Sequence, residues 1–474
     1  MSRTFLFTIV FVTLNFSCFS ISAANGENLS PIRCDASEML RGSMKTNSLG
    51  HLEIGGVDMV KFIEDKQYPV YVMDEKLVRK NMRDYVDSLK KYYSVPGEVF
   101  YASKVLSTLA LCKMCQQEGM GLDVSTEGEL YTAVQAGFPM EKVIMHGNNK
   151  SEAELKMALE YGVGRIVVDN LNDITLLNEL TTSLNKVATV MVRVTPAVQA
   201  HTNAHIATGH DDSKFGFSIK SGAADEAISK VLDSPALKFA GLHMHIGSQI
   251  LDVEDYKQAV DHISSFIKQL QDKKILVNEL DIGGGLGIVY TCKDKKLEIK
   301  DFIKTISGYI TTQFTEQKLK LPKLMLEPGR SIVGEAGTTI YKIGSIKPNS
   351  NGQLYVAVNG GIADDPRKAL YDAQYFGVIA NRMNESQTVN SKIVGKACET
   401  GDVLIEEILL PRAKYGDIFA IFSTGAYNYS MASNYNRVPV PGMVLVEDGK
   451  VKWIVKPQTI QDILRNDLVP EQFK

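Results

Sequence analysis

The sequence lacks an excess of charge of either sign, which argues against nucleic-acid binding. Its 474 residues contain 52 lysines and arginines and 55 aspartates and glutamates, a formal net charge of −3. Without a basic surface, a nucleic acid is not an expected partner. Hydrophobic residues (44%) and charged residues (23%) stand at ordinary globular levels. The length suits a large barrel with a second domain better than one small domain.

Long apolar runs are absent after the N-terminus, so no later segment is expected to span a membrane. At the N-terminus, Arg3 precedes an apolar run at residues 5–16, and small residues follow up to Ala24. This order is typical of a secretory signal peptide, which we predict at residues 1–24. Ser22 is an alternative cleavage position, and an uncleaved membrane anchor is the alternative interpretation. The signal predicts the secretory pathway or the periplasm; without it the protein would be cytoplasmic.

Cysteine is scarce, and the six that occur are Cys18, Cys34, Cys112, Cys115, Cys292 and Cys398. Removing the predicted signal leaves an odd number, which is not a disulfide framework, although export implies an oxidising compartment. Cys112 and Cys115 lie in a helical pattern, and a zinc site would need a second pair of ligands that the sequence does not show. We therefore expect this pair to contribute to helix packing, and we expect no metal.

Low-complexity segments and short repeats are absent, and residues 70–332 alternate short apolar runs with amphipathic stretches. The expected strands are residues 70–73, 98–102, 143–146, 165–168, 187–194, 239–245, 279–282 and 323–327. The expected helices are residues 75–93, 106–118, 126–136, 151–161, 171–184, 224–232, 253–273 and 301–316. Such alternation means parallel pairing, and at this length it predicts an α/β fold with a (β/α)8 TIM-like barrel rather than an open sheet.

The sequence pattern changes after Ser331, where short runs rich in Val, Ile, Thr and Tyr are separated by Gly, Pro and Asp. These runs predict a smaller, mainly β domain, with strands near residues 338–346, 354–358, 391–394, 418–421, 441–447 and 450–455. We expect the N-terminal segment (residues 25–75), including residues 51–54, to pair into it. The predicted domains are a β/α barrel at residues 76–335 and a β domain at residues 336–474.

Two motifs place chemically active side chains at expected strand ends, which form the active-site face of a β/α barrel. Lys104 ends an apolar strand, where burial would weaken its preference for the charged form and permit a Schiff base. Taken alone, a lysine in this position is more often a solvated loop residue. His243 and His245 are two residues apart and point the same way from a strand. No further metal ligand is near them in sequence.

Other motifs follow later strands. The glycine-rich residues 281–287 expose backbone N–H groups that can bind a phosphate, although such a turn is often only a turn. Glu327 and Arg330 close the next strand with an acid and a guanidinium. Three further motifs lie in the second domain: a glycine turn with Arg367 and Tyr371, the thiol and acids of residues 398–402, and the polar, aromatic residues 425–436.

Taken together and in this order, these motifs resemble the pyridoxal-phosphate (PLP) dependent decarboxylases with an alanine-racemase-like barrel, which include the ornithine and arginine decarboxylases. Within that group the sequence is most similar to the diaminopimelate decarboxylases, over roughly residues 68–467. The resemblance implies decarboxylation of meso-2,6-diaminopimelate to L-lysine and CO₂.

The resemblance also implies the residues that bind the cofactor. Lys104 would hold PLP covalently, and His245 would stack on its ring. Glu327 would pair with the ring nitrogen, which makes the ring a strong electron sink. The remaining residues expected around the phosphate and ring are Ser248, Gly284, Gly285, Pro328, Gly329, Arg330 and Tyr427.

Further residues are implied for the substrate. Cys398 would return a proton to Cα, and in this family the thiol comes from the partner subunit, so a homodimer with shared active sites is implied. Arg330, Arg367 and Tyr371 would bind the distal carboxylate, with Tyr427 nearby, and Glu399 would bind the distal amine.

Some features leave alternatives open. Asn359, Lys368 and Ala397 depart from the residues usual in the family, which bears on the substrate. The signal peptide suggests an exported decarboxylase of another diamino acid, such as D-lysine or D-ornithine. A non-catalytic homologue is disfavoured because the lysine and the thiol are both present. A racemase is disfavoured because Glu327 stands where racemases have an arginine.

Overall fold

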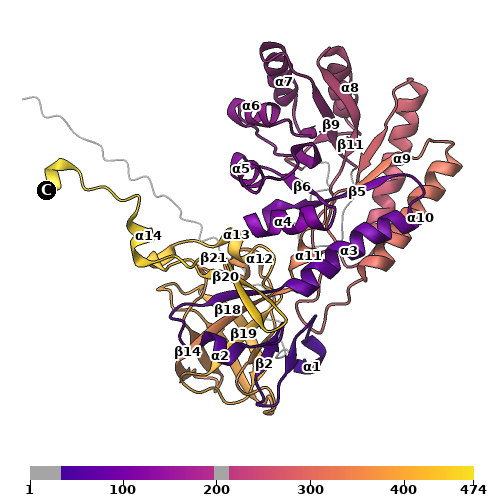
Figure 1. Cartoon of the computed structure of the whole chain (residues 1–474). Helices are drawn as coiled ribbons and strands as arrows, with labels where there is room; N and C mark the ends of the chain where they lie inside the picture. Colours follow the sequence, from indigo (N-terminus) through magenta and orange to yellow (C-terminus); the bar gives the residue numbers. More distant parts are fainter. Residues whose placement is uncertain (1–33, 197–212) are drawn as a thin grey trace, which may run out of the picture.

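Eight parallel strands close into a barrel that forms the first half of the protein (Figure 1). The structure is a computed structural model that describes residues 34–196 and 213–474. Around the barrel the strand order is β9–β11–β12–β13–β5–β6–β7–β8, and β8 pairs with β9 to close it. The strands are β5 (Gly97–Ala102), β6 (Gly121–Val124), β7 (Val143–Met145), β8 (Arg165–Val168), β9 (Ala188–Thr195), β11 (Leu237–His243), β12 (Glu279–Asp281) and β13 (Lys323–Leu326); the short β10 (Phe217–Ser218) pairs with β9.

Side chains fill the barrel interior, as a closed eight-stranded barrel requires. Phe100, Ile144, Val167, Met191 and Met325 form this inner cluster, and each comes from a different strand. The strands are apolar on both faces because the outer face is covered by helices.

The helices surround the barrel, and the predicted ones all form within a few residues of their expected bounds (Figure 1). They are α3 (Glu75–Tyr92), α4 (Leu109–Gln117), α5 (Glu127–Gln135), α6 (Glu152–Tyr161), α7 (Leu171–Ser183), α8 (Ala223–Asp233), α9 (Glu254–Asp272) and α10 (Ile299–Glu316). The local sequence explains where α6 begins: Ser151 and Glu154 form a capping box that satisfies free N–H groups of the first turn. In the described parts of the chain, no helix has the length and apolarity needed to cross a bilayer.

One predicted strand forms outside the barrel. β4 (Val70–Asp74) pairs antiparallel with β14 and parallel with β20, so it belongs to the second sheet. The barrel strand that the sequence pattern missed is β6, whose four residues include Gly121 and Asp123 and therefore lack an apolar run. Residues 70–73 were therefore wrongly expected to begin the strand–helix alternation of the barrel, because β4 pairs with strands of the second sheet.

The β domain is built on a second sheet of nine strands in which β18–β17–β15–β14–β4–β20–β21 are neighbours and β19 joins β14 to β16. The strands are β14 (Gly337–Pro348), β15 (Leu354–Val358), β16 (Gly377–Ile379), β17 (Val389–Val394), β18 (Val403–Leu410), β19 (Ile418–Phe422), β20 (Gly442–Glu447) and β21 (Lys450–Val455). The short helices in this part of the chain are α11 (Arg330–Val333), which packs against α3 of the barrel, α12 (Arg367–Tyr371), α13 (Asn428–Met431) and α14 (Ile460–Leu464).

The last strand of the N-terminal segment (residues 25–75), β4, pairs into the large sheet as expected, while the earlier residues form a small sheet of their own. β1 (Lys45–Thr46), β2 (Leu52–Ile54) and β3 (Val57–Asp58) pair with one another, flanked by α1 (Ala36–Met39) and α2 (Met59–Ile63). A backbone hydrogen bond of 2.8 Å from Leu52 N to Ala380 O joins this sheet to the β domain.

A disulfide between Cys34 and Cys292 ties the N-terminal segment to the loop that follows β12. The sequence-based expectation of no disulfide framework missed this pair, because 258 residues separate the two cysteines. Cys112 and Cys115 are buried free thiols on α4, which places them in helix packing. The predicted signal peptide lies outside the described residues.

Candidate active site

A cavity of about 570 Å³ lies at the C-terminal ends of the barrel strands, next to the β domain. Both domains contribute to its walls, as expected for a ligand site of this fold. The lining residues are Lys104, Asp123, Ser125, Thr126, Glu129, His146, Gly147, Asn148, Arg193, Phe215, His243, His245, Ser248, Glu327, Arg330, Arg367, Tyr371, Tyr427 and Met431.

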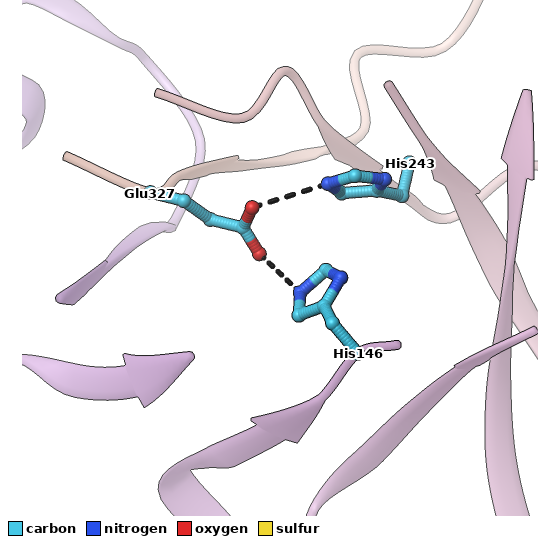
Figure 2. Close-up of side chains that lie close together, drawn as sticks. All are labelled: His146, His243 and Glu327. Atoms are coloured by element: carbon cyan, nitrogen blue, oxygen red, sulfur yellow. Dashed lines mark hydrogen bonds and ion pairs between the residues drawn. The ribbon is translucent and has the colours of Figure 1, made fainter. Parts of the chain in front are cut away.

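One end of the cavity carries a buried carboxylate held by two imidazoles (Figure 2). Glu327 directly follows β13, and its Oε1 lies 2.6 Å from His146 Nε2 while its Oε2 lies 3.1 Å from His243 Nε2. Burial raises the pKa of Glu327, but the two histidines outweigh burial and hold that pKa well below its usual value. Glu327 is therefore ionised.

The two imidazoles differ in protonation. Burial lowers the pKa of His146, but Glu327 and Asp123 outweigh it, so the pKa is raised. Burial dominates at His243 and lowers its pKa to about 4. His146 thus donates to Glu327 as a cation and His243 as a neutral ring. The three groups place ligand-type atoms within 4.8 Å of one another, and in this structure they are hydrogen-bonded to each other.

Lys104 lies directly after β5, in a short turn (Ser103–Val105), and its side chain extends into the cavity. The Lys104 side chain is accessible to solvent through the cavity and is otherwise surrounded by protein. Burial lowers the pKa of Lys104, but the nearby Asp123 and Glu327 outweigh burial, and the net pKa is raised. The expectation that burial weakens its charge was therefore wrong: the neighbouring carboxylates compensate for the lost solvation.

A small hollow beside Lys104 is lined by glycine-rich turns. A Cβ on Gly284 would lie 2.2 Å from the carbonyl oxygen of Glu327, and one on Gly285, where φ is +113°, would lie 2.5 Å from the carbonyl oxygen of Gly247. Any larger residue would close this space. The other lining residues are Ala102, Val105, His245, Ser248, Gly329, Arg330 and Tyr427. Bare backbone with a guanidinium and a hydroxyl suits a phosphate.

Two arginines bring positive charge to the cavity from two different parts of the fold. Arg330 begins α11 after the last barrel strand, and Arg367 begins α12 in the β domain; each is 6% exposed. Their guanidinium carbons lie 4.9 Å and 5.7 Å from the ring centroid of Tyr427, within cation–π range.

The charges of these arginines are not balanced by ion pairs. Arg330 donates to Ser248 Oγ at 3.0 Å and Arg367 to the hydroxyl of Tyr375 at 2.7 Å. Among residues 34–196 and 213–474, no carboxylate forms an ion pair with either guanidinium. Burial lowers the pKa of Arg367, but Tyr375, Tyr290 and Asp365 raise it by more, so the guanidinium stays charged.

Most of the predicted site residues meet in the cavity and the hollow: Lys104, His245, Ser248, Gly284, Gly285, Glu327, Gly329, Arg330, Arg367, Tyr371 and Tyr427. Pro328 lies behind them, where its carbonyl accepts a 3.1 Å hydrogen bond from Ala102 N. Cys398 and Glu399 are exposed and line neither space. The backbone N–H of Cys398 donates to Asn436 Oδ1 at 2.7 Å, and Tyr435 donates to Glu399 Oε2 at 3.2 Å.

Sequence reasoning missed several residues of the acidic end, chiefly Asp123, Glu129, His146 and Arg193. Asp123 lies in β6, His146 directly after β7 and Arg193 in β9. A polar side chain at the C-terminal end of a barrel strand was the available signal for all three. Glu129 lies on α5, and burial raises its pKa to about 7; its position on a helix gave no such signal.

The chemistry of these groups fits pyridoxal phosphate. The cofactor needs an amine for its aldehyde, a carboxylate for its ring nitrogen and a cradle for its phosphate. Lys104, the ionised Glu327 and the glycine-lined hollow with Arg330 provide these three features. The fold and the site together define a PLP enzyme with a β/α barrel.

Comparison with known families gives the same result. Residues 75–334 match the family model for the pyridoxal binding domain of the pyridoxal-dependent decarboxylases. The chain belongs to this family of pyridoxal-dependent decarboxylases. The predicted fold class, cofactor and enzyme class are thereby confirmed.

The individual relatives are more specific. The chain is 44% identical to a diaminopimelate decarboxylase of Bacillus subtilis over 430 residues, which cover 90% of this chain and 98% of that protein. A solved diaminopimelate decarboxylase of M. jannaschii in complex with L-lysine has a TM-score of 0.85 and 32% identity, and covers 91% of this chain and 99% of the other. A lysine/ornithine decarboxylase of Vibrio vulnificus has a TM-score of 0.69 and 23% identity over 82% of this chain and 97% of the other, which shows a shared fold only.

Proposed function

We propose that this protein decarboxylates meso-2,6-diaminopimelate to L-lysine and CO₂. The observation that carries this proposal is the pair of buried, charged guanidiniums of Arg330 and Arg367 without a carboxylate partner in the described chain. A buried cation without an ion-pair partner is costly, so the site favours a ligand that supplies a carboxylate. Diaminopimelate retains a carboxylate at its far end after CO₂ leaves, whereas lysine and ornithine have none. The similarity to the diaminopimelate decarboxylase of Bacillus subtilis supports the same substrate.

Different residues of the chain have different roles in binding the cofactor. Bound PLP supplies an electron sink for the electrons left on Cα when CO₂ departs. Lys104 would bind the cofactor, and the ionised Glu327 would hold a proton on the ring nitrogen. His245, Ser248 and the hollow at Gly284 and Gly285 orient the ring and phosphate.

Arg330, Arg367 and Tyr371 bind the distal carboxylate of the substrate, where charge-assisted hydrogen bonds fix its orientation. Tyr427, whose ring lies beneath both guanidiniums, limits the space around them. The substrate therefore presents only one of its two carboxylates to the cofactor.

The proton that replaces CO₂ comes from Cys398 of a second copy of the chain, in a homodimer, where Glu399 binds the distal amine. The exposure of both residues outside their own cavity supports this arrangement. Mixing Lys104→Ala and Cys398→Ala proteins should restore roughly a quarter of the wild-type activity, because half of the dimers are mixed and each holds one complete site. No rescue after proven subunit exchange would overturn the shared site.

We also propose export through the N-terminal signal at residues 1–24. The Cys34–Cys292 disulfide supports export because such bonds persist in oxidising compartments. Mass spectrometry of the mature protein should find the N-terminus near Asn25 and this disulfide intact. A full-length reduced protein in the cytoplasm would contradict the proposal.

The substrate is tested by CO₂ release from meso-diaminopimelate, D-lysine, D-ornithine and L-ornithine with the PLP-loaded wild-type protein. We expect the highest kcat/KM for meso-diaminopimelate and L-lysine as the product. The rival substrates D-lysine and D-ornithine are favoured by the predicted export. A higher kcat/KM for either would overturn the choice of diaminopimelate.

A further inference from the structure

Tyr290 connects the two arginines of the cavity, although no sequence motif drew attention to it. It lies in the loop between β12 and α10, is 7% exposed, and packs with Ile288 and Val289 into the core of the β domain. The loop thus leaves the barrel and becomes part of the second domain before it returns. Tyr290 therefore lies where the two halves of the substrate site meet.

The hydroxyl oxygen of Tyr290 accepts hydrogen bonds from both guanidiniums. Arg330 Nη1 is in close contact with it, and Arg367 Nη1 donates to it at 3.1 Å. The two guanidinium carbons also lie 5.8 Å and 5.4 Å from the centroid of the Tyr290 ring, within cation–π range. One side chain thus makes polar and ring contacts with two cations from different domains.

This arrangement solves a physical problem of the site. Two guanidiniums near each other repel, and in a buried place the repulsion is only weakly screened. An oxygen that accepts from both offsets part of the repulsion and fixes their separation. Two fixed forks can then bind one carboxylate with little loss of conformational freedom on binding.

The loop that carries Tyr290 is itself anchored on both sides. Gln249 Nε2 donates to Ile288 O at 2.7 Å, and Ser423 Oγ donates to Val289 O at 2.8 Å. Two residues beyond Tyr290, the disulfide joins Cys292 to Cys34 of the N-terminal segment. The covalent tie limits how far the Tyr290 hydroxyl can move from the arginines.

We propose that Tyr290 is a positioning residue that holds Arg330 and Arg367 for the distal carboxylate of the substrate, and that the Cys34–Cys292 disulfide holds Tyr290 in place. The proposal rests on the proposed function, in which these arginines bind that carboxylate. It goes further by assigning substrate selectivity to a residue that contacts the arginines and to a covalent tie outside the cavity.

The first test is Tyr290→Phe in the PLP-loaded protein, which removes only the hydroxyl. We expect the KM for meso-diaminopimelate to rise about two- to tenfold, the range for one lost hydrogen bond. The kcat and the absorbance of bound PLP should stay within about twofold, because the hydroxyl contacts neither reacting atoms nor cofactor-binding lysine. Unchanged KM, or an equal loss in kcat, would overturn the positioning role.

The matched control is Tyr93→Phe. Tyr93 is also buried, and its hydroxyl donates to Pro322 O at 2.8 Å, remote from the cavity. It loses a comparable hydrogen bond, so any stability effect is shared, but its KM should equal the wild-type value. A matching rise in KM in both variants would show that Tyr290 acts only through stability.

A binding measurement separates this proposal from the proposed function. Pimelate, which has both carboxylates of diaminopimelate and no amines, is titrated calorimetrically into the wild-type and Tyr290→Phe proteins. Weaker binding to the variant supports the positioning of the arginines whichever amino acid is decarboxylated. Equal binding, or no binding to the wild type, overturns it, whereas failure of diaminopimelate turnover alone overturns only the proposed substrate.

The covalent tie is tested with a Cys34→Ser/Cys292→Ser double variant. We expect its KM for meso-diaminopimelate to rise, by less than in Tyr290→Phe, with PLP absorbance retained. Adding Tyr290→Phe to this background should have a smaller effect than in the wild type, because the two act through one element. Fully independent effects would overturn the tethering role of the disulfide.

Discussion

The two ends of the cavity differ in how their charges are satisfied. At the barrel end, both oxygens of Glu327 are hydrogen-bonded to His146 and His243 within the protein (Figure 2). At the junction with the β domain, the guanidiniums of Arg330 and Arg367 contact hydroxyls and aromatic rings, and no carboxylate of the described residues forms an ion pair with them. At one end the charge is paired within the protein, and at the other it is not.

This difference indicates separate tasks. A carboxylate whose partners are built in keeps one protonation state, which is what a cofactor ring requires. Buried cations without an ion-pair partner gain stability when a ligand brings an anion. The barrel end therefore determines the chemistry, and the arginine end determines which amino acid reaches it. The predictions below change one end at a time.

The largest effect is expected from Lys104, on which both ends depend. Lys104→Ala removes the amine that binds PLP, so the near-visible absorbance of the bound cofactor and the CO₂ release should both be lost for every substrate. Lys113→Ala, which changes an exposed lysine on the following helix, should leave both unchanged. Retained absorbance and turnover in Lys104→Ala would contradict the assignment.

A smaller and more selective effect is expected at the arginine end. Arg367→Leu should lower kcat/KM for meso-diaminopimelate about ten- to a hundredfold, the cost of a charge-assisted contact of roughly 1.5–3 kcal/mol. Turnover of D-lysine, which has no distal carboxylate, should be unchanged or improved, and PLP absorbance should persist. Arg412→Leu, at an exposed site in the same domain, is the matched control. A uniform loss across substrates would erase the distinction between the two ends.

The architecture could be predicted from the sequence wherever a local pattern repeats. The apolar runs at β7, β8 and β13 and the amphipathic helices between the strands were sufficient for the barrel, because each pattern is set by neighbours in the chain. β6 was missed because Gly121 and Asp123 break its apolar run, and Asp123 is there to face the cavity. The residue that obscured the strand thus belongs to the site.

The contacts that complete the site are long-range, and a pattern along the chain does not contain them. Tyr290 meets Arg330 and Arg367 only after two domains pack together, and Cys34 meets Cys292 across 258 residues. The raised pKa of Lys104 likewise depends on Asp123, which comes from the neighbouring strand. Motifs identified most of the groups that line the cavity, while the charge balance among them required their positions in space.

The last expected effect is on stability rather than on turnover, and it is a pH dependence at the barrel end. The lowered pKa of Glu327 means that its stabilising contribution is present above its ordinary value of 4.5 and is lost as the pH falls through the lowered pKa. The raised pKa of His146 means that its contribution is complete below 6.5 and is lost as the pH rises through the raised pKa. The pair should therefore stabilise the protein most between these two ordinary values.

Denaturant unfolding of the wild type and of His146→Asn across this pH range measures the contribution. The loss of unfolding free energy should be about 1.5–3 kcal/mol between pH 4.5 and 6.5, as for a hydrogen bond to a charged group. Above pH 6.5 it should shrink, by about 1.4 kcal/mol for each unit by which the pKa of His146 is raised. In a Glu327→Gln background the same substitution should lose most of this pH dependence, because the partner charge is gone. A loss that stays constant with pH would mean that His146 is neutral and that the barrel end, like the arginine end, depends on a ligand to balance its charge.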